Sequence, residues 1–92
     1  MSIQWLFEVI ESRKQNPSSK SYTSSLFAAG LPKIAQKVGE EGTEVVVAAL
    51  AQDDQRLIEE VADLTYHTLV LLAARGLKIQ DVIAELEKRH NH

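Results

Sequence analysis

The chain has 92 residues, of which 45% are hydrophobic and 25% are charged, and its net charge is −3 at neutral pH. This length predicts one domain over residues 1–92, and the composition is typical of a folded protein. A mildly acidic chain argues against a nucleic-acid-binding protein, which normally carries a basic face. The chain has no cysteine, which excludes disulfides and cysteine-based zinc sites. No apolar run is long enough to span a membrane, and we expect no membrane partner.

All of the predicted elements are helical. Apolar residues recur at steps of three and four over residues 3–14, and residues 16–19 form a loop. A short helix is expected over residues 23–29, ended by Gly30. Pro32 suits the first turn of a long helix over residues 31–51. Two more helices are expected over residues 55–75 and 79–89, with residues 90–92 as a frayed tail. The fold class is therefore all-α, with four main helices and a short helix between the first two.

Two features of these helices have more than one explanation. The hydroxyl residues Ser21, Tyr22 and Thr23 either cap the short helix or contact a phosphate, and capping is the commoner role. Gly39 and Gly42 lie inside the long helix, where each costs about 1 kcal/mol relative to alanine. They are either tolerated there, or they allow another helix or a ligand to approach this face closely.

Two pairs of carboxylates mark the two longest helices. Glu41 and Glu44 form the first pair, and Glu60 and Asp63 form the second. Residues three apart share a helix face, and a short connection makes neighbouring helices antiparallel, so the two pairs can converge. Oxygen ligands of this kind suit Mg²⁺, with Mn²⁺ as an alternative. The competing interpretation is a solvated acidic surface, and spacing alone does not decide between the two.

The residues beside these acids bear on that choice. Apolar side chains bracket both pairs, so we expect the acids to lie beside the core rather than on the far side of their helices. Lys37 either pairs with Glu40 or Glu41 or holds a substrate phosphate as a point charge. His67, one turn after Asp63, is expected to be a hydrogen-bonded histidine at the edge of the core, because a site rich in oxygen does not need it as a ligand.

Taken together, the motifs resemble the phosphoribosyl-ATP pyrophosphatase family over about residues 3–89. The matching stretches are Ser21-Tyr22-Thr23, residues 33–44 with their Lys-x-Gly-Glu-Glu-x-x-Glu pattern, residues 59–67, and residues 71–76. The carboxylate signature by itself is shared by the wider all-α NTP pyrophosphohydrolase superfamily, which includes MazG-like proteins and dimeric dUTPases. The chain departs from the family pattern at Gly42-Thr43, where two small residues such as alanines are usual, and at Thr65, where an aliphatic residue is usual. Neither departure removes a carboxylate.

The resemblance implies Mg²⁺-dependent hydrolysis of phosphoribosyl-ATP to phosphoribosyl-AMP and pyrophosphate, the second step of histidine biosynthesis, in the cytoplasm. It also implies a MazG-like helical bundle completed by a homodimer. The family's metal ligands correspond to Glu41, Glu44, Glu60 and Asp63. Glu40 is an auxiliary acid, and Glu40 or Glu41 is the candidate acceptor of the proton from the attacking water. The candidate substrate contacts are Lys20, Ser21, Tyr22, Thr23, Lys33, Lys37 and Arg75.

Two rival functions remain at this point. The nearer one is a superfamily member that removes non-standard nucleotides, although the Ser-Tyr-Thr stretch and Tyr66-His67 favour phosphoribosyl-ATP. The other is a helical interaction module without catalytic activity. Nothing in the chain resembles the cyclohydrolase to which this domain is often fused, so we expect either the stand-alone form or an excised domain.

Overall fold

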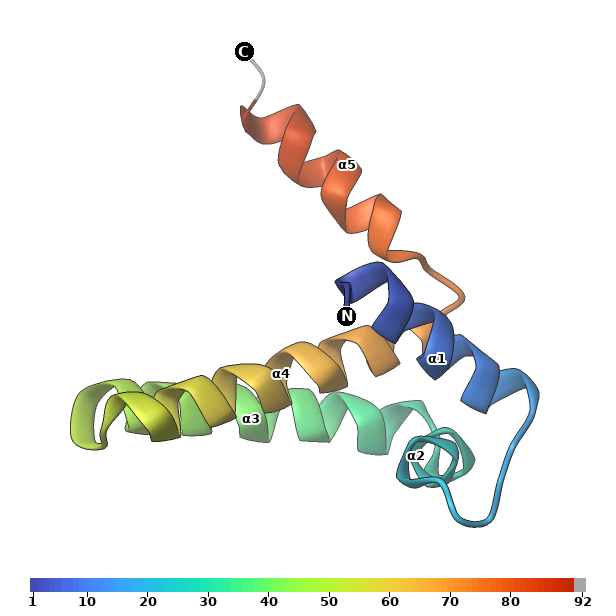
Figure 1. Ribbon diagram of the computed structural model, residues 1–92, viewed down its shortest axis with the longest axis horizontal. Helices are drawn as coiled ribbons and strands as arrows, with labels where there is room; N and C mark the ends of the chain where they lie inside the picture. The colour runs from blue at the N-terminus through green and yellow to red at the C-terminus, as the bar shows by residue number, and fades with distance from the viewer. Residues whose placement is uncertain (91–92) are drawn as a thin grey trace.

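A computed structural model describes residues 1–90, and all regular secondary structure in this range is helical (Figure 1). The helices are α1 (Ile3–Gln15), α2 (Tyr22–Ala29), α3 (Leu31–Ala51), α4 (Asp54–Ala74) and α5 (Ile79–His90). The predicted all-α fold is confirmed, and the expected helix bounds differ from the observed ones by no more than one residue. His90 belongs to α5 rather than to a frayed tail, while Asn91 and His92 lie outside the described residues.

Side-chain caps and glycines set where the helices begin and end. Ser2, Ser21 and Asp53 each accept a hydrogen bond from the backbone amide three residues later, at 3.0, 3.1 and 2.9 Å. Each bond satisfies an amide that the first turn of a helix leaves without a partner. Gly30 and Gly76 follow α2 and α4 with φ of +99° and +73°, a backbone conformation that favours glycine.

The core lies where α1 and α2 cross one end of the α3–α4 pair. Apolar side chains from all four helices are buried there: Phe7, Ile10, Leu26, Ile34, Leu69, Val70 and Ala73. α3 and α4 form the most extensive contact of any two helices, and the two-residue connection between them makes them antiparallel (Figure 1). α5 buries no residue and projects away from the other helices (Figure 1). Among residues 1–90 there is no helix with the length and hydropathy needed to cross a membrane.

The two glycines inside α3 have open space around them. A Cβ atom built on Gly39 or Gly42 would meet no atom within 4 Å, apart from the backbone of its own helix and its chain neighbours. No other part of the described chain therefore requires a glycine at either position. The remaining explanations are a tolerated glycine and a surface that a ligand or another molecule approaches.

Gly39→Ala separates these explanations. Gly39 is exposed in the middle of a helix, so alanine should raise the free energy of unfolding by about 0.5–1 kcal/mol if the glycine is merely tolerated. Urea denaturation measures the change. Gly76→Ala is the control: its surroundings are equally open but its φ is positive, so strain should lower stability by roughly 1–2 kcal/mol. A destabilised Gly39→Ala protein would show instead that another molecule packs closely at this position.

Candidate functional site

Three of the four predicted metal ligands meet between α3 and α4. Carboxylate oxygens of Glu41, Glu60 and Asp63 all lie within 4.8 Å of one another. The antiparallel arrangement of the two helices brings the middle of α3 to the first half of α4. Glu41 and Glu60 are only 7% and 5% exposed, so they lie inside the helix interface and not on the far side of their helices. The interpretation of the acids as a solvated surface does not hold for these two glutamates.

Each buried glutamate keeps one oxygen without a hydrogen-bond partner. The atoms are Glu41 Oε2 and Glu60 Oε2. An unpaired carboxylate oxygen loses the water that would solvate it, and neighbouring carboxylates repel one another, so the arrangement costs free energy. A cation bound between the two glutamates would supply the missing partner for both atoms. The donors are all carboxylate oxygens, and this set fits a hard divalent cation.

Glu44, the fourth predicted ligand, lies at the outer side of this group. It is exposed, it is not among the three residues whose oxygens meet within 4.8 Å, and it lies one turn beyond Glu41. The neighbouring Glu44 carboxyl raises the pKa of Glu60, and the burial of Glu60 raises it further. Glu44 and Glu60 also line a shared cavity of about 270 Å³, whose other lining residues are Val47, Gln52 and Arg56.

Arg56, which is not among the residues predicted from the sequence, contacts the acids directly. Arg56 Nη2 donates to Glu60 Oε1 at 2.6 Å, and Arg56 Nη1 donates to Glu59 Oε1 at 2.5 Å. Arg56 is one turn before Glu60 on α4, a spacing at which side chains of opposite charge meet. That spacing was visible in the sequence. The burial of Glu60, which separates this pair from an ordinary surface ion pair, was not.

His67 lies behind the acids and joins α4 to α2. Its Nδ1 is 2.9 Å from the carbonyl oxygen of Asp63, and its Nε2 is 3.1 Å from the hydroxyl of Tyr22. A carbonyl only accepts, so Nδ1 carries the proton and Nε2 accepts the hydrogen bond from Tyr22. Nδ1 also lies 3.7 Å from Glu41 Oε1. The prediction of a hydrogen-bonded histidine at the edge of the core is confirmed, with a link to Glu41 that was not foreseen.

The hydroxyl residues at the start of α2 divide between two roles. Ser21 caps the helix, as one of the two explanations predicted. Thr23 Oγ1 is hydrogen-bonded to the hydroxyl of Tyr66 on α4. The rings of Tyr22 and Tyr66 stack with their centroids 6.4 Å apart. The start of α2 is therefore held against the part of α4 that follows Asp63.

Glu40 is exposed and contacts Lys37 and Gln36 rather than the buried acids. Lys37 Nζ is 3.9 Å from Glu40 Oε2, and Gln36 Nε2 donates to Glu40 Oε1 at 2.7 Å. The Glu40 side chain is 47% exposed. Neighbouring residues of a helix point in different directions, which places Glu40 on the solvent side and Glu41 in the interface. Lys37 therefore forms a salt bridge with Glu40, as one of its two explanations predicted. Its contact with a substrate phosphate stays a prediction.

The structure does not bring the other predicted cations to the acids within this chain. Lys20, Lys33 and Arg75 are all exposed. At 1.5 Å per residue, Lys33 lies roughly 12 Å along α3 from Glu41, and Arg75 roughly 18 Å along α4 from Asp63. Arg75 instead lines a cavity of about 350 Å³ at the far end of α4, together with Leu31, Ala35, Leu71, Leu72 and Leu77.

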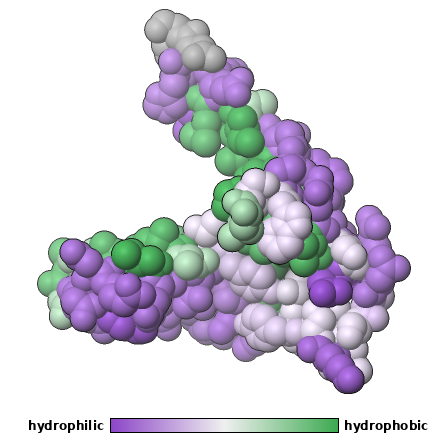
Figure 2. Space-filling model, viewed as in Figure 1, coloured by the Kyte–Doolittle hydropathy of each residue, from purple (hydrophilic) through white to green (hydrophobic). Residues whose placement is uncertain are grey.

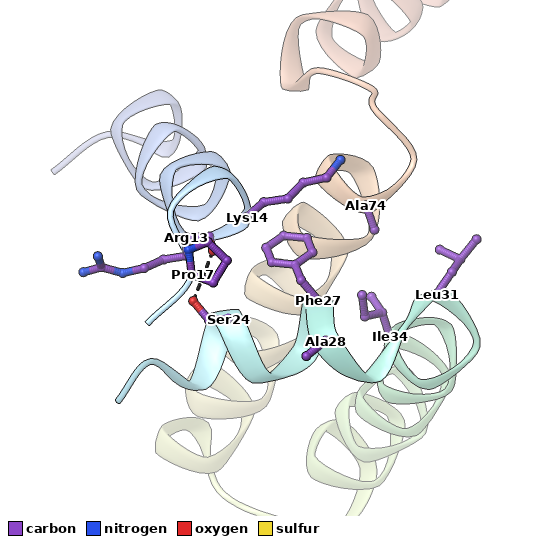
Figure 3. A pocket seen from close by; sticks show the side chains of 9 residues that line it. All are labelled: Arg13, Lys14, Pro17, Ser24, Phe27, Ala28, Leu31, Ile34 and Ala74. Atoms are coloured by element: carbon purple, nitrogen blue, oxygen red, sulfur yellow. Dashed lines mark hydrogen bonds between the residues drawn. The ribbon is translucent and has the colours of Figure 1, made fainter. Parts of the chain in front are cut away.

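A third cavity, of about 400 Å³, lies where α1 and α2 meet the ends of α3 and α4 (Figure 3). None of the predicted site residues lines it; the lining residues are Arg13, Lys14, Pro17, Ser24, Phe27, Ala28, Leu31, Ile34 and Ala74. Two of its polar groups already have partners, because Lys14 Nζ donates to the Ala73 carbonyl at 2.7 Å and Ser24 Oγ to the Arg13 carbonyl at 3.1 Å. We assign the cavity to helix packing.

Comparison with known proteins gives a consistent result. The family model described as phosphoribosyl-ATP pyrophosphohydrolase matches residues 4–90. A phosphoribosyl-ATP pyrophosphatase of Clostridium botulinum strain Hall is 51% identical, over 95% of this chain and 79% of its own length. That of Pyrobaculum calidifontis is 52% identical, over 95% of this chain and 93% of its own. That of Listeria welshimeri is 54% identical, over 91% and 81%. The motif resemblance is confirmed: the chain belongs to the phosphoribosyl-ATP pyrophosphohydrolase family.

Proposed function

We propose that this protein hydrolyses phosphoribosyl-ATP to phosphoribosyl-AMP and pyrophosphate, the second step of histidine biosynthesis. The observation that carries the proposal is the pair of buried, unpartnered oxygens on Glu41 and Glu60, in a chain whose relatives are named for this activity. Glu41, Glu44, Glu60 and Asp63 would hold Mg²⁺, with Mn²⁺ as the alternative. When bound, the cation would neutralise phosphate charge and activate water. A cytoplasmic setting belongs to the proposal as well, because it rests on the resemblance alone.

Hydrolysis needs a group that accepts a proton from the attacking water. Of the two candidates, Glu41 is the better placed, because its carboxylate lies in the group where the cation and the attacking water would meet. Glu40 is half exposed and already accepts a hydrogen bond from Gln36. In our proposal Glu41 takes the proton as water attacks, the α–β phosphoanhydride bond breaks, and pyrophosphate leaves.

The start of α2 is the proposed contact for the phosphoribosyl group that ordinary nucleoside triphosphates lack. Tyr22 uses its hydroxyl proton toward His67, so its oxygen stays free to accept from a ribose hydroxyl. Lys20, Ser21 and Thr23 are the neighbouring polar groups on the same segment. Lys37 is the nearest predicted lysine to the acids, whereas Lys33 and Arg75 are suited only to the distal end of the substrate or to the site of a second copy.

We also propose a homodimer, because a large apolar surface stays uncovered. The exposed apolar residues include Val46, Val47, Leu50, Ile58 and Val61 on the α3–α4 pair, and Val82, Ile83 and Leu86 on α5. Figure 2 shows hydrophobic surface on both of these arms. An apolar cavity of about 320 Å³ lies between them, lined by Ile3, Leu64, Thr65, Thr68, Leu69, Leu72, Ile79 and Val82. Exposed apolar surface on this scale is typical of an association site.

Glu44→Gln tests the metal assignment. Replacing a ligand oxygen should lower the rate of pyrophosphate release from phosphoribosyl-ATP by roughly 100-fold or more at saturating Mg²⁺. Asp63→Asn should behave in the same way. Glu87→Gln removes one charge from the exposed face of α5 and serves as the control. Wild-type rates in the Glu44→Gln protein would exclude Glu44 from the metal site.

A panel of nucleotides tests the substrate. We expect phosphoribosyl-ATP to be hydrolysed roughly 100-fold more efficiently than ATP, dUTP or oxidised nucleoside triphosphates, because only it reaches the polar start of α2. The measurement is kcat/KM for pyrophosphate release. Preference for a non-standard nucleotide would show instead that the protein removes such nucleotides. If no nucleotide is hydrolysed, the protein is a helical interaction module without catalytic activity.

Leu86→Glu tests the dimer. A charge in the apolar stripe of α5 should shift the protein from dimer to monomer at micromolar concentration, because an unpaired carboxylate is costly in an apolar interface. Sedimentation velocity measures the shift. Ala84→Glu adds the same charge to the opposite side of α5 and should leave the dimer intact. A wild-type protein that sediments as a monomer contradicts the proposal directly.

A further inference from the structure

We infer that Arg56 is a built-in counter-ion of the carboxylate group, which competes with the divalent cation for Glu60 and contacts a substrate phosphate once displaced. The inference rests on the proposed metal site. It adds a residue that neither the sequence motifs nor the family resemblance selected.

The Arg56–Glu60 pair is unlike the surface ion pairs of this protein. The Glu60 side chain is 6% exposed and the Arg56 side chain is 49% exposed, so the acid is fixed and the base can swing into solvent. In the Arg89–Glu85 pair of α5, which has the same spacing, the side chains are 69% and 51% exposed. A pair with two exposed partners contributes little, whereas a buried acid needs its cation.

The charges of the site explain why Arg56 is held there. Glu60 shares its surroundings with Glu41, Asp63 and Glu44, and all four are acids. Arg56 is bonded to Glu60 Oε1 and leaves Oε2 without a partner, so it compensates only part of the negative charge. A guanidinium and a divalent cation at the same carboxylate repel each other. The cation therefore binds Glu60 fully only when Arg56 moves away.

The cavity beside the pair gives the displaced side chain a place to act. The space of about 270 Å³ is lined by Arg56 together with the two acids Glu44 and Glu60 and with Val47 and Gln52. A guanidinium offers planar, paired donors that match two oxygens of a phosphate. A phosphate entering this cavity would lie next to the metal ligands and within reach of Arg56. When Arg56 exchanges its bond to Glu60 for a bond to phosphate, metal binding becomes linked to substrate binding.

Arg56→Gln tests the competition without any catalytic turnover. Calorimetric titration of substrate-free protein with Mn²⁺ should show roughly 5- to 10-fold tighter binding in the variant than in the wild type, because a competing positive charge is gone. In EDTA the variant should melt at a lower temperature than the wild type, because the acids lose their counter-ion. Arg89→Gln makes the same charge change at an exposed pair and should alter neither quantity.

Arg56→Lys tests the phosphate contact. Lysine keeps the charge but lacks the paired donors, so Mn²⁺ affinity should stay near that of the wild type. Affinity for inorganic pyrophosphate in the presence of Mg²⁺ should fall roughly 10-fold in Arg56→Gln and by less in Arg56→Lys. Unchanged pyrophosphate affinity in Arg56→Gln would refute the phosphate contact.

The outcomes separate this inference from the proposed function. If the wild type binds Mn²⁺ and Arg56→Gln binds it equally or more weakly, the counter-ion role is wrong and the metal site stands. If the wild type binds no Mn²⁺ at all, the metal site and the counter-ion role are both wrong. Circular dichroism of each variant confirms that it is helical before titration.

Discussion

The antiparallel contact of α3 and α4 places two glutamates, Glu41 and Glu60, inside a helix interface, and the rest of the site follows from that burial. Carboxylates in such a place must be neutralised or hydrogen-bonded, because they have lost their water. Arg56 meets this need in part at Glu60, and a bound cation would supply a partner for the two oxygens that remain. The apolar core at the other end of the pair, where α1 and α2 cross, keeps the two helices together despite the repulsion between the acids.

His67 connects the carboxylate group between α3 and α4 to a third helix, α2. His67 is hydrogen-bonded to the Asp63 carbonyl on one side and to Tyr22 on the other. A shift of α2 would therefore move the part of α4 that lies next to the acids. The bond between Thr23 and Tyr66 makes a second link between the same helices. A substrate group bound at the start of α2 and a phosphate bound at the acids would therefore be held at a set distance from each other. That is the requirement for selecting a nucleotide that carries a second phosphoribosyl group.

The uncovered apolar surface follows from the size and shape of the chain. A chain of 92 residues leaves much of its surface exposed when folded, and here α5 projects away without burying a residue. The apolar residues of α5 and of the distal half of the α3–α4 pair lie on separate arms (Figure 2). A second copy placed against both arms would bury them together. The open space around Gly39 would allow a second copy to approach α3 there, but it does not by itself require a dimer.

The sequence by itself determined the helices to within one residue, because periodicity and caps such as Ser21 and Asp53 act over a few neighbouring positions. It also determined which acids share a helix face, since spacing along a helix is fixed. Only the tertiary structure decided that Glu41 is buried while Glu40 is half exposed, and that Arg56 is bonded to a buried acid rather than a surface one. Burial depends on how one helix is rotated against another, and that rotation is set by contacts between residues far apart in the chain. No local pattern of residues contains this information.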